Sequence, residues 1–183
     1  MPAPRSLGTG ASRDRRTYGV IMYLTRYNAC FLPEDSYMPL LHDEAYRSQV
    51  INRIRRLRSD TPKHWGKMSA DQMLWHVNGG LSMALGQIDV ARQKPPLPQP
   101  IMRWLVLNLP WPKGAPTLPP FVASGPYDFD AERNRCLRLI DQLAAKPLDE
   151  RWPTHPALGT MSGREASRLQ AKHLEHHLKQ FGV

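Results

Sequence analysis

Histidines gather at the carboxyl end of this chain, where three of its seven lie within the last eleven residues. His173 and His177 are four residues apart. On a helix, that spacing places both side chains on one face, with Cβ atoms about 5–6 Å apart. Two imidazoles so placed can bind one metal ion, although an HxxxH pair alone specifies no third ligand. His176 points roughly 100° away from His177, so we expect it at the edge of such a site or on the surface.

His76 is the candidate for the third ligand. It lies in the middle of another predicted helix whose apolar face includes Met73 and Val77, so the alternative is a core histidine satisfied by its neighbours. Gly79 and Gly80 follow it and would let backbone or substrate come close. Three histidines would leave one coordination position open for water or substrate, which is the catalytic arrangement of a metal site. Neutral imidazole suits zinc, nickel or ferrous iron, and the sequence does not choose between them.

Three further polar residues have two interpretations each. Gln72 is one turn before His76, and Gln180 is three residues after His177. Either glutamine could hydrogen-bond a metal-binding histidine from outside, or its amide could face solvent. His155 lies in the tight loop HPALG and is the candidate acid or base, unless it only orders that loop. His42 and His64 have the character of ordinary loop residues.

The elements that must position these residues are helical. Apolar residues recur at helical spacing in four segments. Ser69 with Gln72, and Ser162 with Glu165, form capping boxes at the start of the second and fourth segments. Asp130 is the expected cap of the third. The predicted helices are residues 43–58, 69–86, 130–145 and 162–182.

A long connection, residues 87–129, separates the second and third helices and holds more than half of the eighteen prolines. Proline excludes ordinary helix or central strand from most of it. A short helix is expected at Ile101–Leu109. A connection of this length favours a functional role, with Trp104, Trp111 and Phe121 either lining a pocket or packing over the end of the helices. The predicted fold is an all-α four-helix bundle with a long proline-rich crossover between helices 2 and 3.

Length and composition limit the classes of function. We expect residues 1–37 to be a poorly ordered N-terminal extension, or a start-site artefact, and residues 38–183 to be a single domain. The net charge of +9 invites a nucleic-acid partner. The cations are spread along helix faces without interleaved aromatics, which argues against that partner. No stretch reaches the roughly 18 apolar residues of a membrane span. The two cysteines fit a reducing cytoplasm.

Three stretches of the sequence are informative together: WGKMSADQMLWH (65–76), LPWPKGAPT (109–117) and HPALGTMSGREASRLQAKHLEHHLKQFGV (155–183). They resemble a DinB-like family, a branch of unknown function in the DinB/YfiT-like metalloprotein superfamily. The resemblance runs from about Met38 to the end. It implies a four-helix bundle whose metal ligands are His76, His173 and His177. This branch often has tryptophan where Ala166 stands, which leaves the ligand set intact but changes the packing beside it.

The resemblance also implies chemistry. Characterised superfamily members include thiol-dependent transferases and proposed metal-dependent hydrolases, and dimers are common among them. We therefore expect a divalent-metal-dependent enzyme that activates a thiol or a water. Transfer of a low-molecular-weight thiol to a small electrophilic substrate is the leading expectation. A metal-dependent hydrolase, and a non-catalytic stress-related binding or scaffold protein, are the alternatives. A cytoplasmic homodimer is the expected form.

Overall fold

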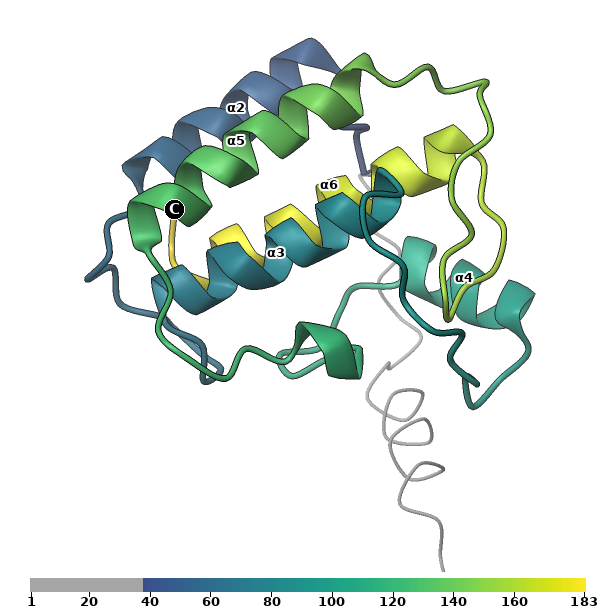
Figure 1. Cartoon of the computed structure of the whole chain (residues 1–183), viewed down its shortest axis with the longest axis horizontal. Coiled ribbons are helices and arrows are strands. Elements are labelled where there is room, and N and C mark those ends of the chain that lie inside the picture. Colours follow the sequence, from purple (N-terminus) through teal and green to yellow (C-terminus); the bar gives the residue numbers. More distant parts are fainter. Residues whose placement is uncertain (1–37) are drawn as a thin grey trace, which may run out of the picture. The chain divides into compact units, whose positions relative to one another are not determined.

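The computed structural model describes residues 38–183, so the predicted N-terminal extension, residues 1–37, lies outside the described residues. Within the described part the chain is all-helical, as predicted, and contains no β-strand (Figure 1). No helix there is long and apolar enough to cross a membrane. The elements are α2 (Glu44–Arg56), α3 (Ala70–Ala84), α4 (Gln99–Asn108), the 3₁₀ helix η1 (Pro119–Phe121), α5 (Phe129–Ala145) and α6 (Gly163–Gln180).

The predicted capping boxes begin the two helices that carry the histidines. At α6, the Glu165 amide donates to Ser162 Oγ at 3.2 Å, and the Ser162 amide donates to Glu165 Oε2 at 2.8 Å. At α3, the Ser69 amide donates to Gln72 Oε1 at 3.1 Å. These contacts satisfy amides that have no partner inside the helix, so both helix starts are fixed by local sequence.

The start of α5 corrects one prediction. Asp128, not Asp130, is the capping residue, because its Oδ1 accepts from the Ala131 amide at 2.9 Å. Asp130 lies in the first turn and pairs with Arg133 at 2.7 Å. An aspartate is favoured at the cap and also in the first turn, where it meets the positive end of the helix dipole. The sequence DFD therefore fits two starting points equally well.

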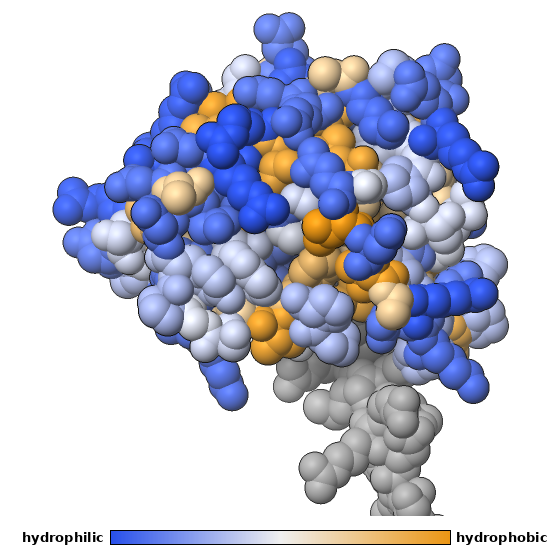
Figure 2. All heavy atoms as spheres, viewed as in Figure 1, coloured by the Kyte–Doolittle hydropathy of each residue, from blue (hydrophilic) through white to orange (hydrophobic). Residues whose placement is uncertain are grey.

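Four of the helices pack closely together. Figure 1 shows α2 beside α5 and α3 beside α6, and α3 also packs on α5. Their apolar stripes meet in one core, while the face seen in Figure 2 is largely hydrophilic, with hydrophobic residues gathered near its middle. The largest fully buried side chains of the core are Leu41, Val50, Ile54, Leu57, Met73, Leu74, Val77, Leu81, Ile140, Leu143 and Leu178.

The segment between α3 and α5 contains two helical pieces. The predicted short helix is present as α4 and begins two residues early, because proline at the second position is compatible with a first helical turn. The buried ammonium of Lys172 on α6 holds the end of α4. Its Nζ donates to the backbone oxygens of Val106 at 2.8 Å, Leu107 at 3.2 Å and Leu109 at 2.5 Å. This cation satisfies carbonyls that the helix end leaves without partners.

Candidate metal centre

Three histidines from two neighbouring helices converge. One ring nitrogen each from His76 on α3 and from His173 and His177 on α6 lie within 4.8 Å of one another. The three ring centroids are 4.9 Å apart pairwise, and the rings meet edge to face. His76 and His177 are each 6% exposed, and His173 is half-buried. The structure therefore brings together all three predicted ligands in an arrangement that could hold a metal ion.

His76 is oriented by a backbone oxygen. Its Nδ1 lies 2.9 Å from the carbonyl oxygen of Phe121 in η1, and because a carbonyl only accepts, Nδ1 carries the proton. The lone pair of the neutral ring is then on Nε2, the atom that faces the other histidines. Gly79 makes this contact possible, because a Cβ at that position would lie 2.6 Å from the Phe121 ring. The glycine lets η1 approach α3, as the sequence predicted for close backbone contact.

His177 is oriented by a side-chain oxygen. Its Nδ1 lies 2.8 Å from Gln180 Oε1, and Gln180 Nε2 donates to the backbone oxygen of Trp65 at 2.8 Å. Gln180 is only 3% exposed, so of its two predicted roles it has the one beside the histidine. Gly66 leaves room for the amide: its φ is +81°, and a Cβ there would lie 2.3 Å from Gln180 Nε2. The loop before α3 thus fixes the ring of a histidine on α6.

His173 makes the closest contact of the three. Its Nε2 is 2.9 Å from Nε2 of His76, whereas nitrogens bound to one tetrahedral zinc at the usual bond length are about 3.3 Å apart. A contact of 2.9 Å between ring nitrogens needs a proton between them. His76 has its proton on Nδ1, so His173 is the donor. A metal ion at this place would displace that proton, which is the ordinary coupling of metal binding to protonation.

Burial keeps these imidazoles neutral. Desolvation lowers the pKa of His76, and the Phe121 carbonyl opposes it only in part. Desolvation, followed by neighbouring His76 and His177, lowers the pKa of His173 well below its ordinary value. The pKa of His177 is lowered to about 3, again chiefly by burial. At neutral pH all three rings are in the uncharged form that binds metals.

Two tryptophan rings lie beside this cluster. The Trp111 ring centroid lies 5.8 Å from that of His173 and 5.7 Å from that of His176. The Trp65 ring centroid lies 6.1 Å from that of His176. The ammonium of Lys113 lies over the Trp65 ring at 4.9 Å, and that of Lys172 over the Trp111 ring at 5.8 Å. His176 is half-buried among these rings, which fits its predicted place at the edge of the site.

Other predicted site residues are placed differently. Trp104 is 58% exposed on α4, and no ring contact joins it to the histidines within the described residues. Phe121 is buried and acts through its carbonyl, beside its packing on α3. Gln72 belongs to the cap of α3, and its Nε2 donates to the Gly125 backbone oxygen at 3.1 Å. Of the three proposed lining residues, Trp111 alone has a ring contact with the clustered histidines among the described residues.

His155 orders its own loop, which was one of its two predicted roles. Its Nδ1 accepts from the amides of Ala157 and Leu158, both at 3.2 Å, and its backbone exchanges two hydrogen bonds with Gly159. Burial lowers the pKa of this ring to about 4. His42, expected to be an ordinary loop residue, instead hydrogen-bonds Ser167 Oγ at 2.9 Å and the Lys146 backbone oxygen at 2.8 Å.

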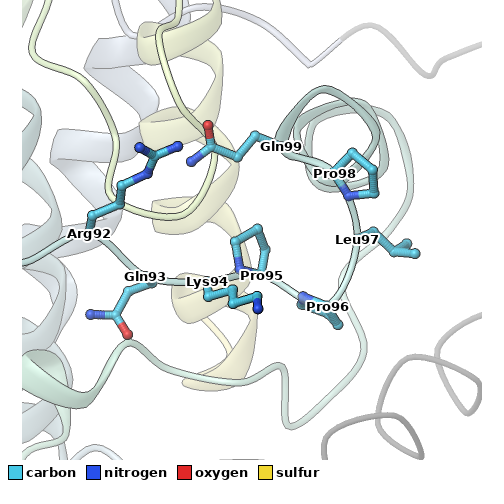
Figure 3. Close-up of a pocket in the computed structure, with 8 residues that line it drawn as sticks. All are labelled: Arg92, Gln93, Lys94, Pro95, Pro96, Leu97, Pro98 and Gln99. Carbon is cyan, nitrogen blue, oxygen red and sulfur yellow. The ribbon is translucent and has the colours of Figure 1, made fainter.

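A separate hollow lies at the start of α4. Arg92 to Gln99 line a cavity of about 530 Å³, and all of these residues come from one continuous segment (Figure 3). The cavity is formed by a bend of the proline-rich connection and is open to solvent, and none of the site histidines borders it. The histidine cluster therefore remains the candidate site.

Two contributors to the centre escaped sequence reasoning. The Phe121 and Trp65 oxygens belong to the backbone, and because every residue type has a backbone oxygen, the sequence does not indicate these two. The only local signal is a glycine beside each contact, Gly79 for one and Gly66 for the other.

Comparison with known proteins gives a family but no activity. A family model described as "Protein of unknown function (DUF1569)" matches residues 41–182, a range that contains all three clustered histidines and most of the chain. Comparisons with the curated proteins and with the solved structures gave no match. This chain therefore belongs to the DUF1569 family of proteins of unknown function.

Proposed function

We propose that this protein is a divalent-metal-dependent enzyme in which His76, His173 and His177 bind the metal. The observation that carries the proposal is the convergence of three neutral imidazoles within 4.8 Å, two of them with Nδ1 already held by an oxygen. Three protein ligands leave a fourth position for substrate or water, which is typical of catalytic metal sites.

We also propose that the fold is a four-helix bundle of the DinB/YfiT-like superfamily. Helices α2, α3, α5 and α6 would form the bundle, and residues 85–128 would be the proline-rich crossover between its second and third helices. The packing of α3 on α6 and of α2 on α5 supports this assignment. So does the supply of the histidines by α3 and α6, which the resemblance assigns as one ligand and two.

The proposed reaction is transfer of a low-molecular-weight thiol to a small electrophile. A bound divalent ion would lower the pKa of a thiol or a water at its open position and so provide a nucleophile at neutral pH. The chain's own residues would orient and shield the reactants. Trp111 and His176 would exclude water from one side of the site, and Lys113, beside Trp65, would attract an anionic group of the thiol compound.

A conjugation assay tests this function. Full-length protein without a histidine tag is reconstituted in turn with zinc, nickel and ferrous iron. Each form is then supplied with a chromogenic electrophile and a panel of low-molecular-weight thiols. We expect metal-dependent conjugation that a His173→Ala, His177→Ala double variant lacks, while the exposed His64→Gln variant retains it. Hydrolysis of activated esters without thiol would support the hydrolase alternative. Metal-loaded protein that accelerates neither reaction would contradict the enzyme proposal.

A further inference from the structure

Gln170 has a buried oxygen that the packing of the helices does not explain. It lies on α6, three residues before His173, and is 3% exposed. Its Oε1 has no hydrogen-bond partner among the described residues. A buried acceptor without a partner is unfavourable, because the oxygen has lost its water. Such an atom needs a partner, either a water or a group that the chain supplies in another state.

The position of this oxygen points to His173. A Cβ built on Gly80 of α3 would lie 3.4 Å from Gln170 Oε1 and 3.1 Å from His173 Nδ1. Both atoms therefore lie against α3 at the position where Gly80 has no side chain. Gln170 also lines a small cavity of about 10 Å³ together with His155, Met161 and Ala166, which is space for about one water.

No hydrogen bond joins Gln170 Oε1 to Nδ1 of His173 in this structure, and the tautomer of His173 is consistent with that. His173 donates from Nε2 to His76, so as a neutral ring it has no proton on Nδ1. An imidazole lone pair and an amide oxygen are both acceptors and cannot bond each other. A metal ion needs the lone pair of Nε2. When Nε2 of His173 binds a metal, the proton of the neutral ring must be on Nδ1, the ring nitrogen that lies against Gly80, as Gln170 Oε1 also does.

We propose that Gln170 is a positioning residue of the metal centre, whose Oε1 accepts the Nδ1–H of His173 when Nε2 of that histidine binds the metal. Each of the three histidines would then donate Nδ1–H to one oxygen. The oxygen belongs to Phe121 for His76, to Gln180 for His177 and to Gln170 for His173. The number of protons on the ring is unchanged, because the proton that leaves Nε2 for solvent is replaced by one that Nδ1 takes up. This inference rests on the proposed metal site.

Two variants of the full-length, tag-free chain test the role of Gln170. Gln170→Met removes the oxygen and keeps the volume, so we expect its zinc affinity to fall about 10–100-fold, as when other outer partners of ligand histidines are removed. Gln170→Glu retains an acceptor and is expected to stay within about threefold of the wild type. Gln142→Met, an exposed glutamine on α5, is the matched control and should bind zinc like the wild type. Affinities come from competition with a chelator, and thermal unfolding of the zinc-depleted variants confirms that each one folds.

Nitrogen-15 NMR of the imidazoles reports the tautomer of His173, which should not change if Gln170 has only a structural role. We expect His173 to carry its proton on Nε2 in the zinc-depleted protein and on Nδ1 in the zinc-loaded protein. Equal zinc affinity of Gln170→Met and wild type, or an unchanged tautomer on zinc loading, would overturn the role of Gln170 and leave the metal site standing. Absence of zinc uptake by the wild type would overturn both.

Discussion

His76 and His177 each donate Nδ1–H to an oxygen that lies outside the histidine cluster. The second contact is itself held in place, because Gln180 cannot rotate without losing the Trp65 carbonyl. Rings fixed in this way lose little freedom when they bind a metal, and outer hydrogen bonds of this kind raise the basicity of the ligand nitrogen. At the scale of single residues, the oxygens that orient the rings are as much a part of the candidate site as the histidines themselves.

Replacing Gly66 by alanine tests the support of His177. The new Cβ would lie 2.3 Å from Gln180 Nε2, so the amide must move and release the imidazole. We expect zinc affinity to fall about 10–100-fold. We also expect a loss of about 1–2 kcal/mol of unfolding free energy, because the backbone at this position is left-handed. Chelator competition and urea unfolding measure the two effects.

Gly114→Ala is the matched control for this substitution. Gly114 also has positive φ, but a Cβ there would meet nothing within 4 Å. It should show the loss of stability without the loss of zinc affinity. Equal zinc affinities of the Gly66→Ala variant and the wild type would show that Gln180 does not position His177.

The clustering of the three histidines was easier to predict than the residues that orient them. His173 and His177 follow from helical spacing alone. His76 could only be a candidate, since a histidine on an apolar helix face has a second explanation. The role of Gln180 stayed open because its fixed partner, the Trp65 oxygen, lies 115 residues away in sequence. Residue spacing along α6 does not indicate that the loop containing Trp65 packs against Gln180.

At the scale of elements, the contact between η1 and α3 places the Phe121 carbonyl at His76. Glycine to alanine inside a helix ordinarily stabilises by about 1 kcal/mol. Gly79→Ala should have the opposite sign, because its Cβ would lie 2.6 Å from the Phe121 ring. We expect a loss of about 1–3 kcal/mol of unfolding free energy and weaker zinc binding. Gly125→Ala, with nothing within 4 Å of its Cβ, should change neither. A Gly79→Ala variant more stable than the wild type would refute this close contact.

The end of α4 depends on one buried ammonium. Lys172→Met removes the ammonium from three backbone oxygens; the Val106 oxygen keeps the Trp111 indole N–H, whereas the Leu107 and Leu109 oxygens lose this donor. We expect a loss of about 2–3 kcal/mol of unfolding free energy by urea denaturation. Lys179→Met, on the exposed face of the same helix, removes a surface ion pair with Glu175 and should cost less than about 1 kcal/mol. Similar losses in the two variants would mean that Lys172 does not hold α4.

Element boundaries could be predicted where one residue type has one favourable place. Both capping boxes fall where the sequence placed them, because serine followed three residues later by glutamine or glutamate has few alternatives. The DFD segment offered two aspartates, and the structure uses the earlier one. The contact of Lys172 with α4 could not be predicted, since a lysine in the middle of a helix is usually solvated.

At the scale of the whole molecule, acid should destabilise the fold. Burial lowers the pKa of His155 to about 4, while in the unfolded chain it is near 6.5. Between these values the unfolded state binds the proton and the folded state does not, so stability falls as the pH falls. His155→Gln should remove about 1.4 kcal/mol per pH unit from this slope in zinc-depleted protein. Urea unfolding at several pH values in this window measures it, with exposed His64→Gln as the control. A slope that His155→Gln leaves unchanged would mean that the ring titrates normally in the fold.

The pairing of α3 with α6 could not come from periodicity. His76 and His173 are 97 residues apart, and amphipathic stripes do not state which helix packs on which. The residue types made His76 a candidate partner of His173 and His177, and the resemblance implied the same meeting of the second and fourth helices. Apolar periodicity and capping were sufficient to predict the all-α class, whereas the meeting of the histidines depends on tertiary packing.

Metal stoichiometry tests the central claim most directly. Full-length protein without a histidine tag is dialysed against zinc, freed of excess ion and analysed for metal per chain. We predict about one zinc per chain for the wild type and for exposed His64→Gln, and none for the His173→Ala, His177→Ala double variant. A wild-type chain that takes up no metal, or a folded double variant that retains a full equivalent, would contradict the assignment of His76, His173 and His177 as the metal centre.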